Sequence, residues 1–278
     1  MLLLAGLLKK RIAKAYLFVI VLCLSLPILP TCAQQRQGMF MDYQNQMAHL
    51  GRHINKVHQG KFGYLFIATN NGLVRFDGYR YQTIYRTAQG LTDNQVADVL
   101  EDRTGMLWVA GRHQGISQLN PSTGSWKRWP LLWPSKLGSQ EIRKILLDTR
   151  GTLWLATQAG LGRYWAAKDS FLLHPLPDSN WHATGVKDIA LDTQGNLWVL
   201  TAQMLYRFNI TTHQWERFGA TTHYQNQAIT AWKSLSADSS GQLYLVSWSQ
   251  GFYRFAAPWQ SLEPLPERLT NDGSSIKG

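Results

Sequence analysis

A short phrase recurs five times along the chain, and this repeat constrains the fold more than any other feature of the sequence. In each copy a glycine is followed, after one residue, by leucine and then by an aromatic residue. The five glycines are separated by 42, 46, 44 and 46 residues and are Gly63, Gly105, Gly151, Gly195 and Gly241. A period in the forties with several short apolar runs per unit is typical of a β-propeller, whose units are four-stranded blades. Helical repeats share this period, but apolar runs of only about four to eight residues argue against them.

The second unit shows how a blade divides into four strands. Its inner strand is "NQVADVLED", and "MLWVAG", "GISQLN" and "SWKRWP" follow as the second, third and outer strands. We therefore predict an all-β propeller of four-stranded blades over residues 34–265. Five blades with an entry strand could close a small ring, but an incomplete ring in a partial chain is favoured. The predicted blades lie near 54–85, 95–130, 141–176, 185–219 and 229–265. An entry outer strand is expected near 39–44, and residues 266–278 are a linker or the start of a further blade.

Four of the turns between the first two strands share the pattern Asp-x-x-Gly. An aspartate can accept hydrogen bonds from its own turn, and a glycine tolerates the positive φ that closes it. A calcium loop would need more carboxylates than the single one in each turn, so these residues are predicted to be structural. They are Asp102, Gly105, Asp148, Gly151, Asp192, Gly195, Asp238 and Gly241. The aromatic residues of the repeat are expected to pack between blades.

At this point the sequence resembles a known family. The phrase D-x-x-G-x-L-W-x-x-T-x-x-G-L-x-R-F-D, preceded by G-L-x-x-N-x-V, is similar to the two-component regulator propeller repeat, and it matches best at 70–85 and 90–111. The resemblance covers about residues 40 to 256. It implies an exported sensor domain of a bacterial histidine kinase, of the kind found in hybrid two-component systems that detect glycans in Bacteroidetes-type bacteria. In that family a further β-domain, a membrane helix and a kinase follow, so we expect this chain to be the N-terminal part of a longer sensor.

The N-terminus has the pattern of a secretory signal peptide. A basic region from Lys9 to Lys14 precedes an apolar run at 15–31, and Thr31 and Ala33 suit a cut before Gln34. We therefore predict that residues 1–33 are removed and that the domain is periplasmic. An uncleaved membrane anchor is the alternative. The only two cysteines, Cys23 and Cys32, also lie in this segment, so the exported domain would have no disulfide.

The charge of the chain restricts its partners. The formal net charge is +11, and the basic region before the apolar run supplies four of these charges. The remaining charge is spread thinly, without a dense Lys/Arg block, so nucleic acid is not an expected partner. A preference for acidic ligands or an anionic surface is consistent with this excess.

The candidate ligand site lies where topology gathers the variable loops. In a four-stranded blade the hairpin between the second and third strands shares one face with the loop that leads to the next blade. Flat aromatic and polar side chains on this face suit a sugar, although several could instead pack against neighbouring loops. The predicted ligand-binding residues are Arg112, His113, Trp133, Trp181, His182, His223, Tyr224 and Trp248. Trp248 is of particular interest because the sister units carry the small or polar residues Thr69, Arg112, Thr157 and Thr201 at the position that aligns with it.

We find no spacing typical of a catalytic triad, metal site or phosphate loop, so no enzyme, metal or cofactor is predicted for this chain. The sequence hypothesis is an exported ligand-sensing propeller of a two-component sensor that binds an oligosaccharide or another small molecule. Expected partners are downstream sensor and kinase domains if the chain continues, and a second copy in a homodimer. Membrane association would come only through such a continuation or an uncleaved signal. The alternatives are a propeller enzyme of the lyase or quinoprotein type and an assembly module of an export system.

Overall fold

The computed structural model describes residues 53–130, 141–177, 185–202, 204–218, 223–224, 227–228, 232–248, 250–256 and 261–265. The chain divides into two units, Met1–Tyr43 and Gln44–Gly278, and all of the described residues belong to the second. The predicted signal peptide, the entry strand near 39–44 and the tail at 266–278 lie outside the described residues.

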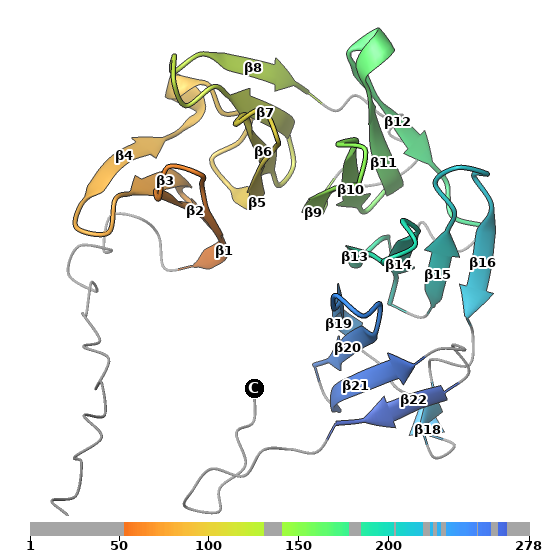
Figure 1. The fold of residues 1–278 in the computed structure, drawn as a ribbon. Helices are drawn as coiled ribbons and strands as arrows, with labels where there is room; N and C mark the ends of the chain where they lie inside the picture. Colours follow the sequence, from red (N-terminus) through yellow and green to blue (C-terminus); the bar gives the residue numbers. More distant parts are fainter. Residues whose placement is uncertain are drawn as a thin grey trace, which may run out of the picture. The chain divides into compact units, whose positions relative to one another are not determined.

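The described residues form five antiparallel four-stranded sheets, each with its strands in chain order (Figure 1). The first sheet holds β1 (Ile54–Gln59), β2 (Leu65–Thr69), β3 (Gly72–Phe76) and β4 (Tyr81–Tyr85). The second holds β5 (Val96–Glu101), β6 (Leu107–Gly111), β7 (Gly115–Leu119) and β8 (Trp126–Trp129). The third holds β9 (Ile142–Leu147), β10 (Leu153–Thr157), β11 (Gly160–Trp165) and β12 (Ser170–His174).

The fourth sheet holds β13 (Asp188–Leu191), β14 (Leu197–Leu200), β15 (Leu205–Phe208) and β16 (Trp215–Phe218). The fifth holds β19 (Trp232–Ala237), β20 (Leu243–Ser247), β21 (Gly251–Ala256) and β22 (Ser261–Pro264). A two-stranded ribbon, β17 (His223–Tyr224) and β18 (Gln227–Ala228), lies in the connection between them. Two short 3-10 helices, η1 (Thr87–Gln89) and η3 (Ala166–Lys168), complete the described elements. The predicted all-β propeller of four-stranded blades is therefore confirmed.

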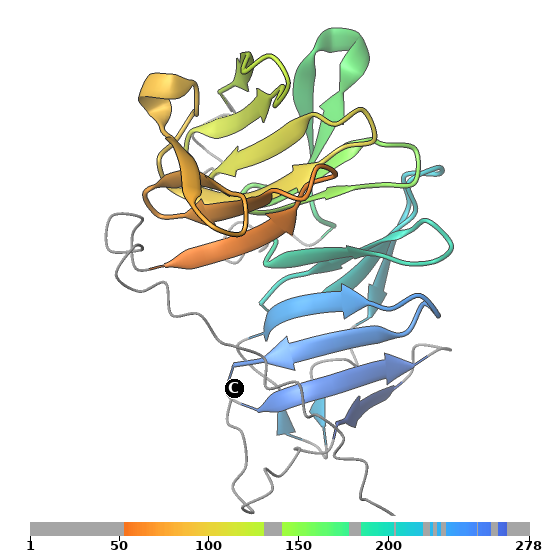
Figure 2. The same ribbon diagram turned by 60° about the vertical axis from the view of Figure 1, so that its left-hand side comes forward.

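The first strand of each sheet, here called the inner strand, lies beside the inner strand of the next sheet. These contacts join β1 to β5, β5 to β9, β9 to β13 and β13 to β19 (Figures 1 and 2). Each of the four buried apolar clusters is shared by two consecutive sheets. The repeat thus builds a series of blades, each packed on its neighbours in the chain.

The second strands of the first four blades are buried along almost their whole length, which explains their continuous apolar sequence, whereas β20 alternates buried and half-buried residues. In β10, Leu153 and Leu155 pack toward the second sheet, whereas Trp154 and Ala156 pack toward the fourth. Successive side chains of a strand point to opposite faces, so a strand between two neighbours needs apolar residues at every position. The aromatic residue of the repeat thus packs between blades, as the sequence suggested.

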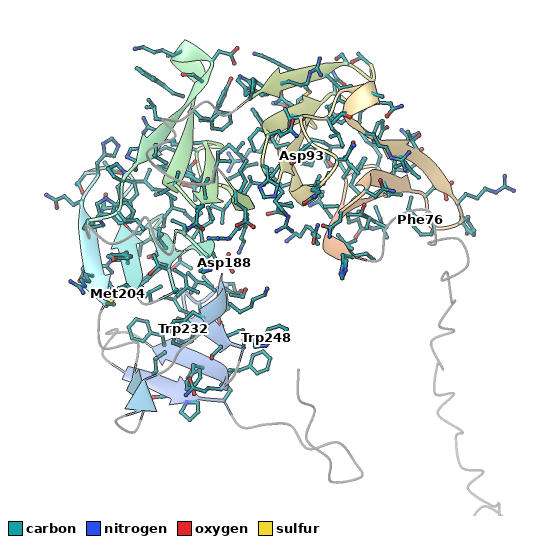
Figure 3. The ribbon with its side chains drawn as sticks, turned by 180° about the vertical axis from the view of Figure 1, so that it is seen from behind. Phe76, Asp93, Asp188, Met204, Trp232 and Trp248 are labelled. Atoms are coloured by element: carbon teal, nitrogen blue, oxygen red, sulfur yellow. The ribbon has the colours of Figure 1, made fainter. Side chains whose placement is uncertain are left out.

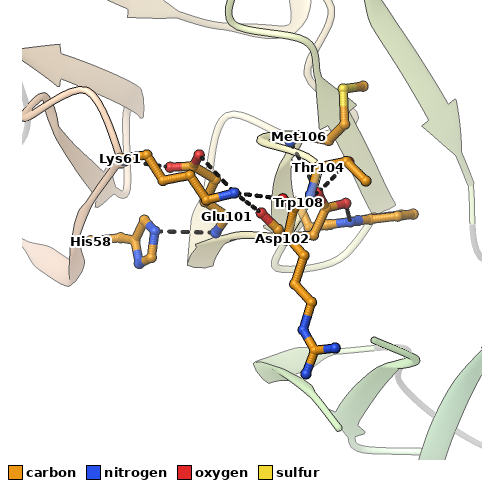
Figure 4. Close-up of polar contacts among 8 residues, drawn as sticks. His58, Lys61, Glu101, Asp102, Thr104, Met106 and Trp108 are labelled. Carbon is orange, nitrogen blue, oxygen red and sulfur yellow. Dashed lines mark hydrogen bonds and ion pairs between the residues drawn. The ribbon is translucent and has the colours of Figure 1, made fainter. Parts of the chain in front are cut away.

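The turn before each second strand is held by its aspartate. The Oδ1 atom of Asp102 accepts the backbone N–H groups of Thr104 at 2.9 Å and Met106 at 3.1 Å, and Oδ2 accepts the indole N–H of Trp108 at 2.8 Å (Figure 4). Gly105 closes this turn with a φ of 88°. The pKa of Asp102 is held below its usual value by these hydrogen bonds, against an opposing effect of burial. The aspartate therefore fixes both the turn and the packed indole.

An equivalent bond recurs in the third, fourth and fifth blades. Asp148 accepts the indole N–H of Trp154 at 3.0 Å, and Asp192 accepts that of Trp198 at 3.0 Å. In the fifth blade the phenol of Tyr244 donates to Asp238 at 3.1 Å. This bond from an aspartate to an aromatic residue six positions later was not expected from the turn pattern alone.

Candidate functional site

One end of the blades carries the hairpins between second and third strands together with the starts of the inner strands, and we call it the hairpin end. The two features meet because an antiparallel second strand ends where the inner strand begins, as Thr157 pairs with Ile142. Hydrogen bonds between blades fix the backbone here. The N–H of Ile142 donates to the carbonyl oxygen of Arg112 at 2.8 Å, and that of Val186 donates to the carbonyl oxygen of Thr157 at 2.9 Å.

Gly185 allows the closest of these approaches. Its φ is 57°, and a Cβ atom at this position would lie 2.6 Å from the Cα of Gln158 in the preceding blade. Only glycine fits both this conformation and this spacing. The start of the fourth blade is therefore held against the hairpin of the third, which gives side chains at this end a rigid support.

At the hairpin end, a bulge near the start of the inner strands changes the direction of the side chains at one position. The pairing of the first two strands shifts by one residue between Ile54 and Lys56, between Val96 and Asp98, and between Trp232 and Ser234. The third blade has the same shift around Arg143. Bulges re-aim side chains and are frequent beside functional sites. The residues at this position, eight before each anchor glycine, are Asn55, Ala97, Arg143, Lys187 and Lys233.

Arg143 of this row belongs to a charged network that joins the second and third blades. The guanidinium of Arg112 lies 3.0 Å from Oε1 of Glu141, and that of Arg143 lies 3.0 Å from Oε2. Arg143 also donates to the side chain of Gln158 and, at 2.8 Å, to the carbonyl oxygen of Val186 in the next blade. One carboxylate thus holds two guanidinium groups in place.

Two lysines continue the row without a carboxylate of their own. Within the part of the chain that the structure describes, neither Lys187 nor Lys233 has an acidic partner within ion-pair distance. Burial and the positive charges of Arg143 and Lys233 lower the pKa of Lys187, and the carboxylate of Glu141 partly opposes them. The ammonium of Lys233 lies 5.7 Å from the ring centre of Trp248.

Among the described residues, Trp248 is the most exposed aromatic group at this end. Its side chain is 77% exposed, and Figure 3 shows it on the fifth blade, near the inner strands. We call Arg112, Glu141, Arg143, Lys187, Lys233 and Trp248 the rim cluster. It combines four cationic groups and one carboxylate, a net charge of +3, with one flat apolar surface. Such a set can bind an anionic group by charge and a ring by stacking.

In a second row, one residue further along each inner strand, Asp98, Lys144, Asp188 and Ser234 are already paired. Seven positions before the glycines the chain has Lys56, Asp98, Lys144, Asp188 and Ser234. Asp188 accepts the ammonium of Lys144 at 2.6 Å. Asp98 accepts the N–H of Ile145 in the next blade at 2.9 Å, and burial raises the pKa of its carboxyl group. These charges join blades and are not available to a ligand. The alternation of charge along this row was visible in the sequence but was not used.

The structure places three of the predicted ligand-binding residues at the hairpin end. Arg112, His113 and Trp248 lie in the hairpins of the second and fifth blades, and the N–H of His113 donates to Asp93 at 2.9 Å. His223 and Tyr224 form β17. Trp133, Trp181 and His182 lie outside the described residues. Sequence reasoning missed Arg143 and Lys233, which belong to inner strands, and Lys187, which directly precedes one.

The alignment of Trp248 with Thr69, Thr157 and Thr201 was wrong. Thr69 pairs with Gly72, and it is Ser247, not Trp248, that pairs with Gly251 in the same way. The hairpins of the second and fifth blades are one residue longer, so Arg112 and Trp248 occupy an inserted position at the tip. Trp248 therefore replaces no residue of the shorter hairpins.

The opposite end of the blades offers a cavity of about 430 Å³ between the second and third sheets. Several of its lining polar groups are already bonded. Asp102 accepts the indole N–H of Trp108, and the phenol of Tyr164 donates to Asp169 at 2.6 Å. Burial and this carboxylate raise the pKa of Tyr164 to about 12. We therefore regard the rim cluster, whose two lysines have no ion-pair partner among the described residues, as the better candidate site.

The described residues contain no group of three or more His, Cys, Asp or Glu side chains that could hold a metal ion. Nor does any helix in the described ranges have the length and apolar character needed to span a bilayer.

The chain is a β-propeller, and solved structures share this fold. Virginiamycin B lyase from Staphylococcus aureus superposes with a TM-score of 0.61 at 15% identity, over 76% of this chain and 69% of the lyase. The extracellular domain of a protein described as the hybrid two-component system BT4673 from B. thetaiotaomicron gives 0.58 at 21% identity, over 70% of this chain but only 26% of that one. PorZ, a surface component of the type-IX secretion system of Porphyromonas gingivalis, gives 0.58 at 13% identity, over 73% of this chain and 32% of PorZ. No protein-family model and no curated protein matches. Likeness at these identities establishes the fold alone.

Proposed function

We propose that this chain is the exported, ligand-sensing propeller of a two-component sensor, and that it binds an oligosaccharide without catalysis. The resemblance of its repeats to the two-component regulator propeller supports this role, as does a structural neighbour from the extracellular part of a hybrid two-component system. The spacing of the repeats specifies a propeller and not its ligand, so the function has to be argued from the site.

The observation that carries the proposal is the rim cluster itself. It brings charged groups and an aromatic surface from four blades to one end, where backbone hydrogen bonds join the second, third and fourth blades. A sugar presents C–H faces that stack on an indole and hydroxyl groups that bind charged side chains. A ligand that bridges several blades would favour one arrangement of them, which is what a sensor requires.

Trp248 provides the direct test. Because its side chain is 77% exposed, Trp248→Ala should leave the thermal midpoint nearly unchanged. If a sugar stacks on this indole, the same change should weaken oligosaccharide binding by about tenfold or more. The binding is measured by calorimetric titration of the exported protein with oligosaccharides chosen from a glycan array. Tyr79→Ala is the matched control, because Tyr79 is 83% exposed and lies in a turn at the opposite end of the first blade.

Loss of binding in Trp248→Ala but not in Tyr79→Ala would support the proposal. The absence of any oligosaccharide ligand, or an equal loss in the control, would contradict it. Chromatography of the sugar after incubation tests the enzyme alternative, since a lyase would release a new product. Mass spectrometry of the exported protein tests the predicted signal peptide, and a mature chain that retains Lys9 would contradict the cleavage before Gln34.

A further inference from the structure

We propose that the rim cluster recognises a negatively charged group on the sugar, a carboxylate or a sulfate ester, and that Lys187 and Lys233 bind it. This inference rests on the proposed function and specifies the ligand class of that site. The cluster carries four cationic side chains and a single carboxylate, and this carboxylate is already shared by Arg112 and Arg143. The two lysines therefore hold two of the three unmatched positive charges.

The surroundings of Lys187 show that this charge has little compensation. The residue is half-buried at the start of the fourth blade, where its N–H donates to the carbonyl oxygen of Leu200 at 2.7 Å. The charged groups that act on it are Arg143, Glu141 and Lys233, of which two are cations. Holding like charges together on a rigid backbone is unfavourable in the absence of an anion. A bound anion would relieve this repulsion, so the arrangement favours a negatively charged ligand.

The neighbouring row offers a comparison within the same inner strands. There Lys144 is matched by Asp188 at 2.6 Å, and Asp188 also accepts the N–H of Leu235 in the fifth blade at 2.7 Å. Cations on these strands thus receive acidic partners where they serve to join blades. Lys187 is half-buried and still has no such partner among the residues that the structure describes, which favours a role in binding rather than in assembly.

The position of Trp248 makes the ligand a sugar rather than a free anion. Lys233 lies 5.7 Å from the ring centre of this exposed indole. A ligand that stacks a pyranose ring on the indole would place a substituent of that ring near the ammonium group. An acidic monosaccharide unit satisfies both groups, whereas an inorganic anion would use only the lysines.

The experiment compares two double variants that remove the same charge. Lys187→Gln with Lys233→Gln removes the proposed contacts, and Arg128→Gln with Lys168→Gln removes two exposed cations from an outer strand and a turn of other blades. Each protein is titrated with tetragalacturonate, a sulfated heparin tetrasaccharide and the neutral sugar maltotetraose. We expect the wild type to prefer one acidic probe, and the rim variant to lose about tenfold or more in affinity for it. The control variant should bind within about twofold of the wild type.

The outcomes separate this inference from the function on which it rests. The preferred acidic probe identifies the group as a carboxylate or a sulfate, and its binding should weaken as salt rises. If maltotetraose binds as tightly as the acidic probes and the rim variant is unaffected, the inference is wrong while an oligosaccharide sensor stands. An equal loss in both double variants would overturn it in favour of general electrostatic attraction. If none of the three probes binds, the inference is wrong, and the glycan array decides separately whether the proposed function holds.

Discussion

The carboxylate of Asp188 is predicted to contribute more to the stability of the blade assembly than any other single charged group on the inner strands. It is buried at 5% exposure and bonded on both oxygens. Oδ1 accepts the N–H of Ile189 at 2.7 Å and the ammonium of Lys144 at 2.6 Å. Oδ2 accepts the N–H of Leu235 at 2.7 Å and the hydroxyl of Ser234 at 2.8 Å, both in the fifth blade. One side chain therefore joins three consecutive blades.

The cost of Asp188→Ala follows from the groups that it would leave without partners. Ile189 and Leu235 are 0% and 1% exposed, so their N–H groups cannot turn to water, and each unsatisfied donor costs about 1–2 kcal/mol. The side chain of Lys144 is 28% exposed, so its ammonium can be hydrated and adds less than about 1 kcal/mol. The free energy of unfolding should fall by about 3–4 kcal/mol, which corresponds to a decrease of roughly 10 °C in Tm.

The measurement is urea unfolding followed by tryptophan fluorescence, with a thermal scan in parallel. Asp188→Asn should fall between the wild type and the alanine variant, because the amide keeps one acceptor oxygen but not the charge. Glu216→Ala, which removes an exposed carboxylate paired with Arg207 on the outer side of the same blade, should change the stability by less than about 1 kcal/mol. A loss below about 1 kcal/mol for Asp188→Ala would refute the view that this carboxylate joins the blades.

Three further changes test other features of the fold. Gly151→Val should destabilise the protein by about 1–3 kcal/mol through backbone strain alone, since the φ of Gly151 is 83° and an added Cβ would have no atom within 4 Å. A neutral effect in urea unfolding would disprove backbone strain at this turn. Gly185→Ala should cost about 2–4 kcal/mol, because strain adds to a contact of 2.6 Å with the backbone of Gln158, and its urea midpoint should fall below that of Gly151→Ala. Burial, with the nearby charges of Arg163 and His213, lowers the pKa of His174 from 6.5 to about 4. Between these two values the unfolded chain binds a proton that the folded chain does not, so the free energy of unfolding should fall as the pH decreases from 6.5 to about 4. Thermal scans at pH 7.5 and 5 should show a smaller loss for His174→Phe than for the wild type; equal losses would show that another group titrates.

The strands could be predicted from the sequence because their signals are local. The phrase around Gly151 contains its own turn and a second strand that is apolar at every position, and both follow from the chemistry of neighbouring residues. Blade order then follows from chain order, since each blade packs on the next.

The candidate site could be predicted only in part, because it depends on register. Lys233 reaches the rim through a bulge that shifts the pairing of the inner strand by one residue, and a single sequence gives no sign of such a shift. The inserted residue in the fifth hairpin misled the alignment of Trp248 for the same reason. Arg112 could be predicted because it lies in a loop, and the loops of a rigid scaffold commonly carry the ligand-binding residues. Three of the five residues that lie eight positions before an anchor glycine are cationic, namely Arg143, Lys187 and Lys233, and this spacing is visible in the sequence.

The sharing of each apolar cluster by two consecutive sheets has a consequence for how the molecule opens. When interfaces run only between neighbours, stability approaches a sum of intrinsic blade terms and nearest-neighbour terms, as in a one-dimensional array. The second, third and fourth sheets each contribute to two of the four clusters, whereas the first and fifth contribute to one. Local opening should therefore begin at β1–β4 or β19–β22, and the amides of β10 should exchange with solvent more slowly than those of β2 or β20. The central blades would then hold the Arg112–Glu141–Arg143 network rigid, while the fifth blade, which carries Lys233 and Trp248, keeps the freedom to close on a ligand.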